Sequence, residues 1–446
     1  MGAREGRDPS AILNCNLGNK NQFGEIAMRQ RTGWTNEVSV LAACFAAAIG
    51  VLTVPAFGQW TQWGGPNQDF KSSTKGLASN WPEEGPKKIW NRPLGEGYSA
   101  IVVDDDRLYT MYREGEQEIV VALNPSSGET VWETKYDCKP AEGHVHEFGD
   151  GPRSTPLVLG DKLYTIGVSG LMHCLTKSDG KVVWVHDLWE EFKGNKLNHG
   201  YSSSPMAYKD TIITLVGGED ASIVAFDKSD GKVVWKKHSF KNSYSTPKLI
   251  KVDGQDQIVT FMANEIIGVD PKDGDLKWRY AHENQWGQNI CLPNWDAKSG
   301  MLFFSNTDAG ARGLKLTRKG DKTEFEEVWS SKKIQFYHVT SVAIGDYVYG
   351  STGARDPSFF AAVNIKDGKV AWRERGFAKA TTVLADGKLI ILDEDGQLGL
   401  ASATPEKFTV HSKVPLLDKV SWTVPTVVGK KMYVRDKKNI MALDLG

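Results

Sequence analysis

The amino-acid sequence predicts an all-β fold, an eight-bladed β-propeller built from four-stranded antiparallel blades. Three observations predict it: a hairpin pattern that returns along the chain, a near-regular spacing of tryptophans, and many glycine turns. Each copy has an alternating apolar strand, an Asx–Gly turn and a second strand that ends in Trp, as in residues 222–235. Glycine supplies the positive φ of a hairpin turn, and β-branched and aromatic residues favour strands. Four-stranded repeats of about 40–50 residues are typical of a propeller.

Residues 1–58 are predicted to form an N-terminal extension and a secretory signal. An apolar stretch at 38–54 follows a basic segment at 28–31, and small residues precede Gln59. This order is typical of a cleaved signal, although a membrane anchor is the alternative. Cys44 ends a segment similar to a lipoprotein processing site, but the apolar run continues beyond it, so we do not expect lipid attachment there. We expect residues 59–446 to form the propeller domain, located in the periplasm or outside the cell.

Tryptophans mark the last strand of the predicted blades. From Trp132 to Trp372, the tryptophans that belong to the hairpin repeats lie 43 to 52 residues apart. Each is at a similar distance from its turn, so we expect each to pack at an equivalent place in its blade. The residues predicted to dock in this way are Trp90, Trp132, Trp184, Trp235, Trp278, Trp329 and Trp372.

The ring is predicted to be closed by an N-terminal strand. The last repeat stops after its third strand, while an unmatched strand containing Trp90 precedes the first repeat. Pairing these segments would complete the last blade and remove two open strand edges. Truncation before Trp90 should then be harmless, and truncation past it should destabilise that blade. The first strands are expected to start at Ser99, Ser154, Ser203, Ser245, Cys291, Val339, Ala380 and Thr423.

Charge and cysteine content exclude several functions. The 54 basic and 55 acidic residues give a net charge of -1, which argues against a general nucleic-acid binder. After the predicted signal the cysteines are Cys138, Cys174 and Cys291, an odd and widely spaced set. They indicate neither a disulfide framework nor a CxxC zinc site. Hydrolase motifs of the Gly-x-Ser-x-Gly or HExxH type are absent from the sequence.

The repeats resemble the pyrroloquinoline-quinone (PQQ) repeat family, whose blades carry the motif Ala-x-Asp-x-x-x-Gly-x-x-x-Trp. Residues 225–235, AFDKSDGKVVW, fit this motif, and the resemblance extends over nearly all of the chain after residue 80. The family contains quinoprotein dehydrogenases, the outer-membrane assembly lipoprotein BamB and secreted bacterial proteins of unassigned role. The resemblance implies an eight-bladed propeller more directly than it implies an activity.

Two functions of different class follow from the resemblance. Enzymes of the family stack the quinone between a tryptophan and a disulfide of adjacent cysteines, and hold calcium with Glu and Asn. This chain has no adjacent cysteines, and no motif in it identifies residues that would bind calcium. We therefore expect a scaffold that binds a protein or a small anionic or planar ligand in the cell envelope, as a monomer. The alternative is a PQQ-dependent alcohol or sugar dehydrogenase with a non-standard site and with calcium.

A ligand site is expected at one mouth of the central channel, because the first strand of each propeller blade lines the channel. The residues before the eight strand starts are Tyr98, Arg153, Ser202, Tyr244, Ile290, His338, Lys379 and Trp422. This ring combines basic and aromatic groups without a carboxylate, which favours an anion or a planar ligand. The alternative is that these residues satisfy one another and line a water channel. Catalytic residues cannot be assigned from this pattern.

The segment His144-Val-His146-Glu147, followed by Asp150, contains groups that could bind a divalent metal. Imidazole and carboxylate suit zinc and similar ions, and a His-x-His pattern on an extended segment places both rings on one side. The spacing fits no established metal motif, and a solvated loop at the channel rim accounts for the same residues. We therefore predict no metal site. If one exists, His144 and His146 are the candidate ligands.

Overall fold

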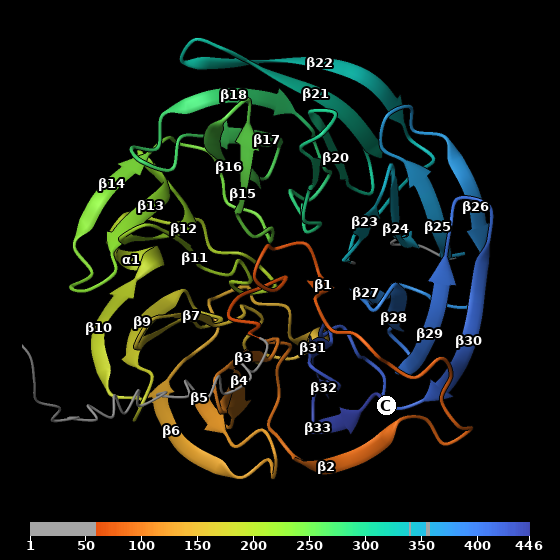
Figure 1. Cartoon of the computed structure of the whole chain (residues 1–446). Helices are drawn as coiled ribbons and strands as arrows, with labels where there is room; N and C mark the ends of the chain where they lie inside the picture. The colour runs from red at the N-terminus through yellow and green to blue at the C-terminus, as the bar shows by residue number, and fades with distance from the viewer. Residues whose placement is uncertain (1–58, 339, 354–356) are drawn as a thin grey trace, which may run out of the picture. The chain divides into compact units, whose positions relative to one another are not determined.

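The predicted ring of blades is present in the structure. The computed structural model describes residues 59–446 except 339 and 354–356, and these described residues form eight β-sheets around a central channel (Figure 1). The predicted signal and Cys44 lie outside the described residues. Seven sheets have four strands, and the eighth has a fifth, short strand, so the predicted eight-bladed propeller is confirmed.

Each blade has four antiparallel strands, with the first strand nearest the channel, and blade 7 has the short parallel strand β1 in addition (Figure 1). Blade 1 contains β3 (Val102–Asp104), β4 (Arg107–Glu114), β5 (Gln117–Leu123) and β6 (Thr130–Asp137). Blade 2 contains β7 (Leu157–Leu159), β8 (Lys162–Ile166), β9 (Leu171–Thr176) and β10 (Val182–Asp187). Blade 3 contains β11 (Met206–Tyr208), β12 (Thr211–Gly218), β13 (Ala221–Asp227) and β14 (Val233–Lys237). Blade 4 contains β15 (Lys248–Val252), β16 (Gln255–Phe261), β17 (Glu265–Val269) and β18 (Leu276–Ala281).

The second half of the ring repeats this order. Blade 5 contains β19 (Asn294–Asp296), β20 (Met301–Ser305), β21 (Ala311–Lys319) and β22 (Lys322–Ser331). Blade 6 contains β23 (Val342–Ile344), β24 (Tyr347–Thr352), β25 (Phe359–Asn364) and β26 (Val370–Glu374). Blade 7 contains β27 (Thr381–Ala385), β28 (Lys388–Leu392), β29 (Gln397–Ala403), β30 (Phe408–Pro415) and β1 (Lys71–Ser72). Blade 8 contains β31 (Thr426–Val428), β32 (Lys431–Arg435), β33 (Asn439–Asp444) and β2 (Lys87–Pro93).

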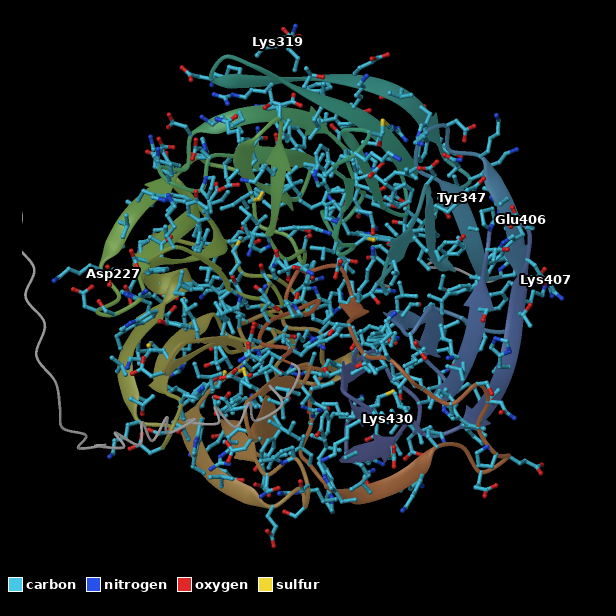
Figure 2. The ribbon with its side chains drawn as sticks, in the orientation of Figure 1. Asp227, Lys319, Tyr347, Glu406, Lys407 and Lys430 are labelled. Atoms are coloured by element: carbon cyan, nitrogen blue, oxygen red, sulfur yellow. The ribbon has the colours of Figure 1, made fainter. Side chains whose placement is uncertain are left out.

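Two short helices lie between strands in blades 1 to 3. The 3-10 helix η1 (His146–Phe148) lies in the loop that leads to β7, and α1 (Leu188–Phe192) follows β10. Asp187 caps α1 by accepting hydrogen bonds from the backbone N–H groups of Trp189 and Glu190. Charged side chains such as Asp227, Lys319, Glu406 and Lys407 lie on the outer rim of the ring (Figure 2).

The tryptophans join each blade to the next. Gly180, in the turn between β9 and β10, has φ +70°, and a Cβ there would lie 2.4 Å from the ring of Trp132 in blade 1. Trp132 Nε1 also donates a hydrogen bond to the carbonyl of Lys177 at 3.1 Å. The turn glycine therefore serves both the hairpin and the docking of the preceding blade. The same packing of a tryptophan ring against the turn glycine of the next blade joins Trp90 to Gly128, Trp184 to Gly231, Trp235 to Gly274 and Trp329 to Gly368.

Two tryptophans depart from this contact. Trp278 Nε1 donates to Gln257 Oε1 of its own blade at 3.0 Å rather than to a turn carbonyl of blade 5. Trp372 Nε1 donates to the carbonyl of Thr404 at 2.8 Å, although that turn has lost its glycine. Between blades 6 and 7, the hydrogen bond to the Thr404 carbonyl therefore holds the tryptophan without a turn glycine.

The strand that contains Trp90 closes the ring, as predicted. β2 pairs antiparallel with β33, so the N-terminal and C-terminal segments complete blade 8 together. Trp90 Nε1 donates to the carbonyl of Pro125 in blade 1 at 3.0 Å. The fully buried Arg435 crosses the same junction and donates to the carbonyls of Met111, at 2.6 Å, and Gly95, at 2.9 Å. Burial lowers the pKa of the Arg435 guanidinium to about 10.

The first strands of most blades begin about three residues later than predicted, as in blade 2, where β7 begins at Leu157 rather than Ser154. In blades 2, 3, 4, 5 and 8 a proline directly precedes the first strand, as at Pro156, and its missing N–H removes a donor for earlier pairing. The intervening Ser and Thr side chains instead bond between blades. Thr155 N–H donates to Ser204 Oγ at 2.9 Å, for example, and Ser204 N–H donates to Thr246 Oγ1 at 3.1 Å. The predicted start at Val339 lies outside the described residues.

The channel is crossed by the segment 60–72, which enters the centre of the ring (Figure 1). Trp60 exchanges backbone hydrogen bonds with Val103 in blade 1, and β1 pairs in parallel with β27 in blade 7. Gln68 bonds to blade 4 by donating to the carbonyl of Pro247 and accepting from the N–H of Leu249. Trp60 and Phe70 are each 1% exposed. Because this segment joins the core, we now expect truncation before Trp90 to destabilise the protein rather than to be harmless.

Candidate functional site

A cavity of about 600 Å³ lies at one mouth of the channel. All eight residues of the predicted ring line it: Tyr98, Arg153, Ser202, Tyr244, Ile290, His338, Lys379 and Trp422. They converge because each lies just before the first strand of its blade, so the repeat places them at equivalent positions around the channel. The volume is in the range of sites that accept a small molecule or a large side chain.

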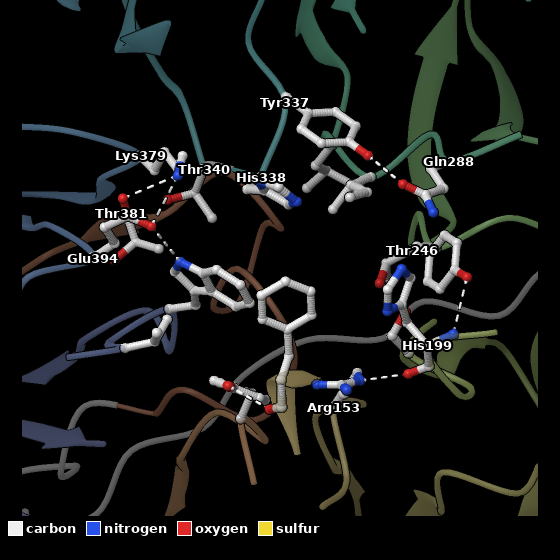
Figure 3. A pocket seen from close by; sticks show the side chains of 18 of the residues that line it. Arg153, His199, Thr246, Gln288, Tyr337, His338, Thr340, Lys379, Thr381 and Glu394 are labelled. Carbon is white, nitrogen blue, oxygen red and sulfur yellow. Dashed lines mark hydrogen bonds and ion pairs between the residues drawn. The ribbon is translucent and has the colours of Figure 1, made fainter. Parts of the chain in front are cut away.

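Arg153 provides a half-buried positive charge on one side of the pocket (Figure 3). Its Nε donates to the carbonyl of His199 at 2.6 Å, and Nη2 donates to the carbonyl of Gly149 at 2.8 Å. The guanidinium carbon lies 5.2 Å from the ring centroid of Tyr98. Burial lowers the pKa of Arg153, but an ordinary value so far above neutrality leaves the group charged. Both hydrogen bonds go to neutral carbonyls, so the charge is oriented without being neutralised by an ion pair.

Stacked aromatic rings form the wall next to Arg153. Trp422 stacks on Tyr98, with ring centroids 5.5 Å apart, and on His338 at 5.4 Å with an interplanar angle of 12°. Phe148 packs against Trp422 at 5.3 Å. The Tyr98 hydroxyl donates to the carbonyl of Phe148 at 2.7 Å, and burial raises the pKa of Tyr98 to about 12. The wall therefore offers flat, uncharged surfaces to a planar group.

The pocket contains a carboxylate, contrary to the expectation of a mouth without one. Glu394 lies on the side of the pocket opposite Arg153, and its Oε1 is 3.0 Å from Lys379 Nζ (Figure 3). Its Oε2 also accepts a hydrogen bond from Trp422 Nε1 at 3.4 Å. Glu394 follows β28 rather than preceding a first strand, so the repeat alignment could not place it in the ring. It offsets the charge of Lys379.

Burial favours the neutral form of the two pocket histidines, His338 and His199. Burial, with a smaller effect of Lys379, lowers the pKa of His338 to about 4. Burial and the nearby Arg153 also lower the pKa of His199. With Lys379 paired to Glu394, Arg153 is the principal unpaired cation among the described lining residues.

Several lining residues lie outside the predicted ring, notably Trp63, Phe148, Trp286, Tyr337 and Glu394. Trp63 comes from the segment that crosses the channel, and its ring packs edge-on against Phe70 at 5.3 Å. Tyr337 immediately precedes His338 and donates to Gln288 Oε1 at 2.7 Å. The sequence could have indicated Tyr337, because it is an aromatic residue next to His338 of the predicted ring. Trp63 precedes the first repeat, so the repeat alignment could not indicate it.

The described lining residues do not fit a quinone with calcium as the family's enzymes hold them. Cys138, Cys174 and Cys291 are buried, and none of them lines the pocket. Glu394 is the carboxylate among these lining residues and is paired with Lys379, while Asn and Asp side chains are absent from the lining. Calcium prefers six to eight oxygen ligands, several of them carboxylates. The pocket therefore gives no support to the dehydrogenase alternative.

The loop before Arg153 brings the predicted metal candidates together. The ligand atoms of His144, His146 and Asp150 all lie within 4.8 Å of one another. Asp150 Oδ1 is 2.7 Å from His146 Nδ1 and 3.3 Å from His144 Nε2. Burial and the nearby Arg153 lower the pKa of His144. Glu147, which lies between the histidines and Asp150, is exposed and outside the cluster.

Comparisons with known proteins agree with the repeat analysis. A family model described as outer membrane protein assembly factor BamB matches residues 115–374. Two curated proteins of that description are similar to the chain. The one from Yersinia pestis is 21% identical over 352 residues, which cover 73% of this chain and 80% of that protein. The one from Burkholderia pseudomallei is 27% identical over 124 residues, which cover 28% of this chain and 29% of that protein.

Solved structures show the same fold at low identity. BamB from Moraxella catarrhalis superposes with a TM-score of 0.55 at 15% identity, covering 80% of this chain and 99% of that one. A quinohemoprotein alcohol dehydrogenase from Pseudomonas putida gives a TM-score of 0.62 at 12% identity, covering 87% and 80%. At these identities the superpositions establish the architecture and leave the activity open.

The described helices include none with the length and apolar character needed to cross a bilayer. The repeat motif, the closed eight-bladed ring and the family match over more than half of the chain agree with one another. The chain belongs to the PQQ-like repeat β-propeller family of the outer membrane protein assembly factor BamB.

Proposed function

We propose that this protein is a binding scaffold of the bacterial cell envelope and that the channel-mouth pocket is its binding site. The pocket would accept a planar or aromatic group that carries a negative charge, either a free small molecule or a group presented by another envelope protein. A role in the assembly of outer-membrane proteins is the form of this function that the family favours. The predicted signal at residues 1–58 would deliver the chain to that compartment.

The observation that carries the proposal is the half-buried Arg153 beside stacked aromatic rings. Arg153 keeps its charge and donates to carbonyls, while Trp422, Tyr98 and Phe148 offer apolar faces beside it. A guanidinium binds carboxylates through two parallel hydrogen bonds, and aromatic walls bind a flat ring. The crossing segment contributes Trp63 to the lining, so the cavity is bounded on the channel side as well as at its rim.

The direct test is binding of naphthalene-2-carboxylate, measured by calorimetry and by tryptophan fluorescence. We expect saturable binding that is at least tenfold tighter than for naphthalene-2-methanol, which has the same ring without the charge. Arg153→Gln should reduce this preference for the carboxylate, because a charged hydrogen bond contributes about 1.5–3 kcal/mol. Trp422→Leu should weaken both probes, because it removes the stacking surface.

A matched control is Lys162→Gln, which removes a cation from blade 2 at a position outside the pocket lining. It should leave the binding of both probes unchanged. Absence of saturable binding by either probe, or equal binding in Arg153→Gln and the unsubstituted protein, would reject the pocket as the site.

Cell fractionation tests the envelope part of the proposal independently. The protein should be found in the envelope fraction without residues 1–58, as shown by mass spectrometry of its N-terminus. Deletion of the gene should lower the amount of outer-membrane proteins if the assembly role is correct. A full-length chain in the cytoplasmic fraction would reject the proposed location even if the pocket binds its probe.

A further inference from the structure

We propose that His144, His146 and Asp150 form a binding site for a divalent transition-metal ion, with zinc as the best match. The site lies in the loop between β6 and β7, and it does not depend on the function proposed for the pocket. It reverses our prediction from the sequence, in which the spacing of these residues gave no metal motif.

The distances between the three ligand atoms suit a single small ion. Asp150 Oδ1 lies 2.7 Å from His146 Nδ1 and 3.3 Å from His144 Nε2, and all three atoms are within 4.8 Å of one another. Zinc bonds of about 2.0–2.2 Å in tetrahedral geometry place neighbouring ligand atoms roughly 3.3 Å apart. Small side-chain rotations would therefore bring the three atoms around one ion.

His144 provides a second and independent indication. Its side chain is 1% exposed, and neither of its ring nitrogens has a hydrogen-bond partner of normal geometry. A buried imidazole without well-aligned hydrogen bonds is costly, because the contact with Asp150 only partly replaces the water that its nitrogens have lost. Its Nε2 lies 3.3 Å from Asp150 Oδ1, and a metal ion bound by both atoms would satisfy it. The structure thus holds a buried nitrogen that lacks the partner an ion would supply.

The loop holds these side chains in place through its own backbone contacts. His144 N–H donates to the carbonyl of Ala141 at 3.1 Å, and Val145 N–H donates to that of Asn198 at 2.7 Å. Asp150 N–H donates to Glu96 Oε2 at 3.2 Å. Arg153 donates to the carbonyls of Gly149 and His199, and the Asp150 carboxylate contacts both imidazoles. Ligands fixed before the ion arrives lose less entropy on binding.

The ligand types select the kind of ion. Two imidazoles and one carboxylate suit zinc and the neighbouring transition metals, whereas calcium and magnesium prefer oxygen ligands. Three protein ligands would leave a fourth position of a tetrahedral ion free. The His146 side chain is 69% exposed, so that position can be reached by water or by an external ligand.

Titration of the full-length protein, purified without a histidine tag, with zinc chloride in a calorimeter tests the proposal. We expect one equivalent of zinc per chain. His146→Gln and Asp150→Asn should each weaken binding by roughly tenfold or more, because each removes one of three ligands. His146 is exposed, so His146→Gln should fold normally, and thermal unfolding in the absence of zinc checks this. Cobalt chloride should give the visible absorption of tetrahedral cobalt in the unsubstituted protein and lose it in both variants.

Two control variants separate this site from general attraction of cations. Glu147→Gln removes a charge from the same loop without touching the cluster, and His411→Gln removes an exposed histidine from blade 7. Both should bind zinc as the unsubstituted protein does. The proposal is overturned if no stoichiometric binding occurs, if His146→Gln binds zinc as well as the unsubstituted protein, or if Glu147→Gln weakens binding as much as His146→Gln.

Discussion

At the residue scale, ionic pairing decides which charges of the pocket a ligand would meet. Lys379 and Arg153 are both cations at the channel mouth. Lys379 forms an ion pair with Glu394, whereas Arg153 donates hydrogen bonds to backbone carbonyls. A sequence pattern that counts basic residues treats the two alike. The structure makes Arg153 the candidate anchor and Lys379 a group whose charge is offset.

Replacing Glu394 by Gln should strengthen the binding of an aromatic carboxylate. The variant keeps an acceptor for Trp422 Nε1 but removes the charge that pairs with Lys379. Affinity for naphthalene-2-carboxylate should rise roughly fivefold, since a partly exposed ion pair is worth up to about 1 kcal/mol. Binding of naphthalene-2-methanol serves as the control and should stay the same. Weaker carboxylate binding in this variant would contradict the assignment of charges.

His282 should make stability depend on pH. Its ring is buried against Phe261 and Phe304, and burial, followed by Arg312, lowers its pKa from about 6.5 to about 3. Above pH 6.5 neither state is protonated there, so His282 has no effect. Below pH 6.5 the unfolded chain takes up a proton that the folded chain does not, so stability is lost as the pH falls.

His282→Phe tests this sign. Between pH 6 and pH 5 the free energy of unfolding should fall by about 1 kcal/mol less in the variant than in the unsubstituted protein. Urea unfolding at the two pH values measures the difference, with His411→Gln as an exposed control that should follow the unsubstituted protein. An equal loss in His282→Phe would show that this histidine is not kept neutral by burial.

At the element scale, the turn glycines couple hairpin geometry to blade docking. Gly180 and Gly160 both have positive φ, at +70° and +62°, but a Cβ would strike Trp132 only at Gly180. At Gly160 nothing lies within 4 Å of the added atom. This pair of glycines in the same blade separates the cost of backbone strain from the cost of losing the tryptophan contact.

Gly180→Ala should therefore destabilise the protein more than Gly160→Ala. Both pay about 1 kcal/mol for a left-handed residue with a Cβ, and Gly180→Ala adds about 1–3 kcal/mol for displacing Trp132. Urea unfolding of the two variants measures the difference. Equal destabilisation would show that the tryptophan contact contributes little to joining the blades.

At the scale of the whole molecule, the N-terminal segment has two structural roles. β2 closes the ring by completing blade 8, while residues 60–72 cross the channel and contact blades 1, 4 and 7. The same segment contributes Trp63 to the pocket. Ring closure and pocket formation therefore both depend on residues that precede the first repeat.

Successive truncations should separate these roles. A chain that begins at Glu83 lacks the buried Trp60 and Phe70, and its melting temperature should fall by roughly 5 °C or more relative to a chain that begins at Gln59. A chain that begins at Ser99 also lacks β2 and should be less stable again. Calorimetric unfolding of the three chains tests this order. If the chain from Ser99 melted at the temperature of the chain from Gln59, the closure by β2 would contribute nothing to stability.

The sequence by itself determined the blades, their number, the closing strand and the eight ring positions around the mouth. These follow from local rules, since a hairpin with an Asx–Gly turn and a tryptophan at a fixed offset folds in the same way in every copy. The tertiary structure decided which other side chains contact the residues at those positions. Glu394 reaches Lys379 from another strand end, Trp63 reaches the pocket through the channel, and His144 meets Asp150 through the course of an irregular loop. Such contacts depend on how blades and loops pack against one another, and no repeat or spacing in the chain encodes them.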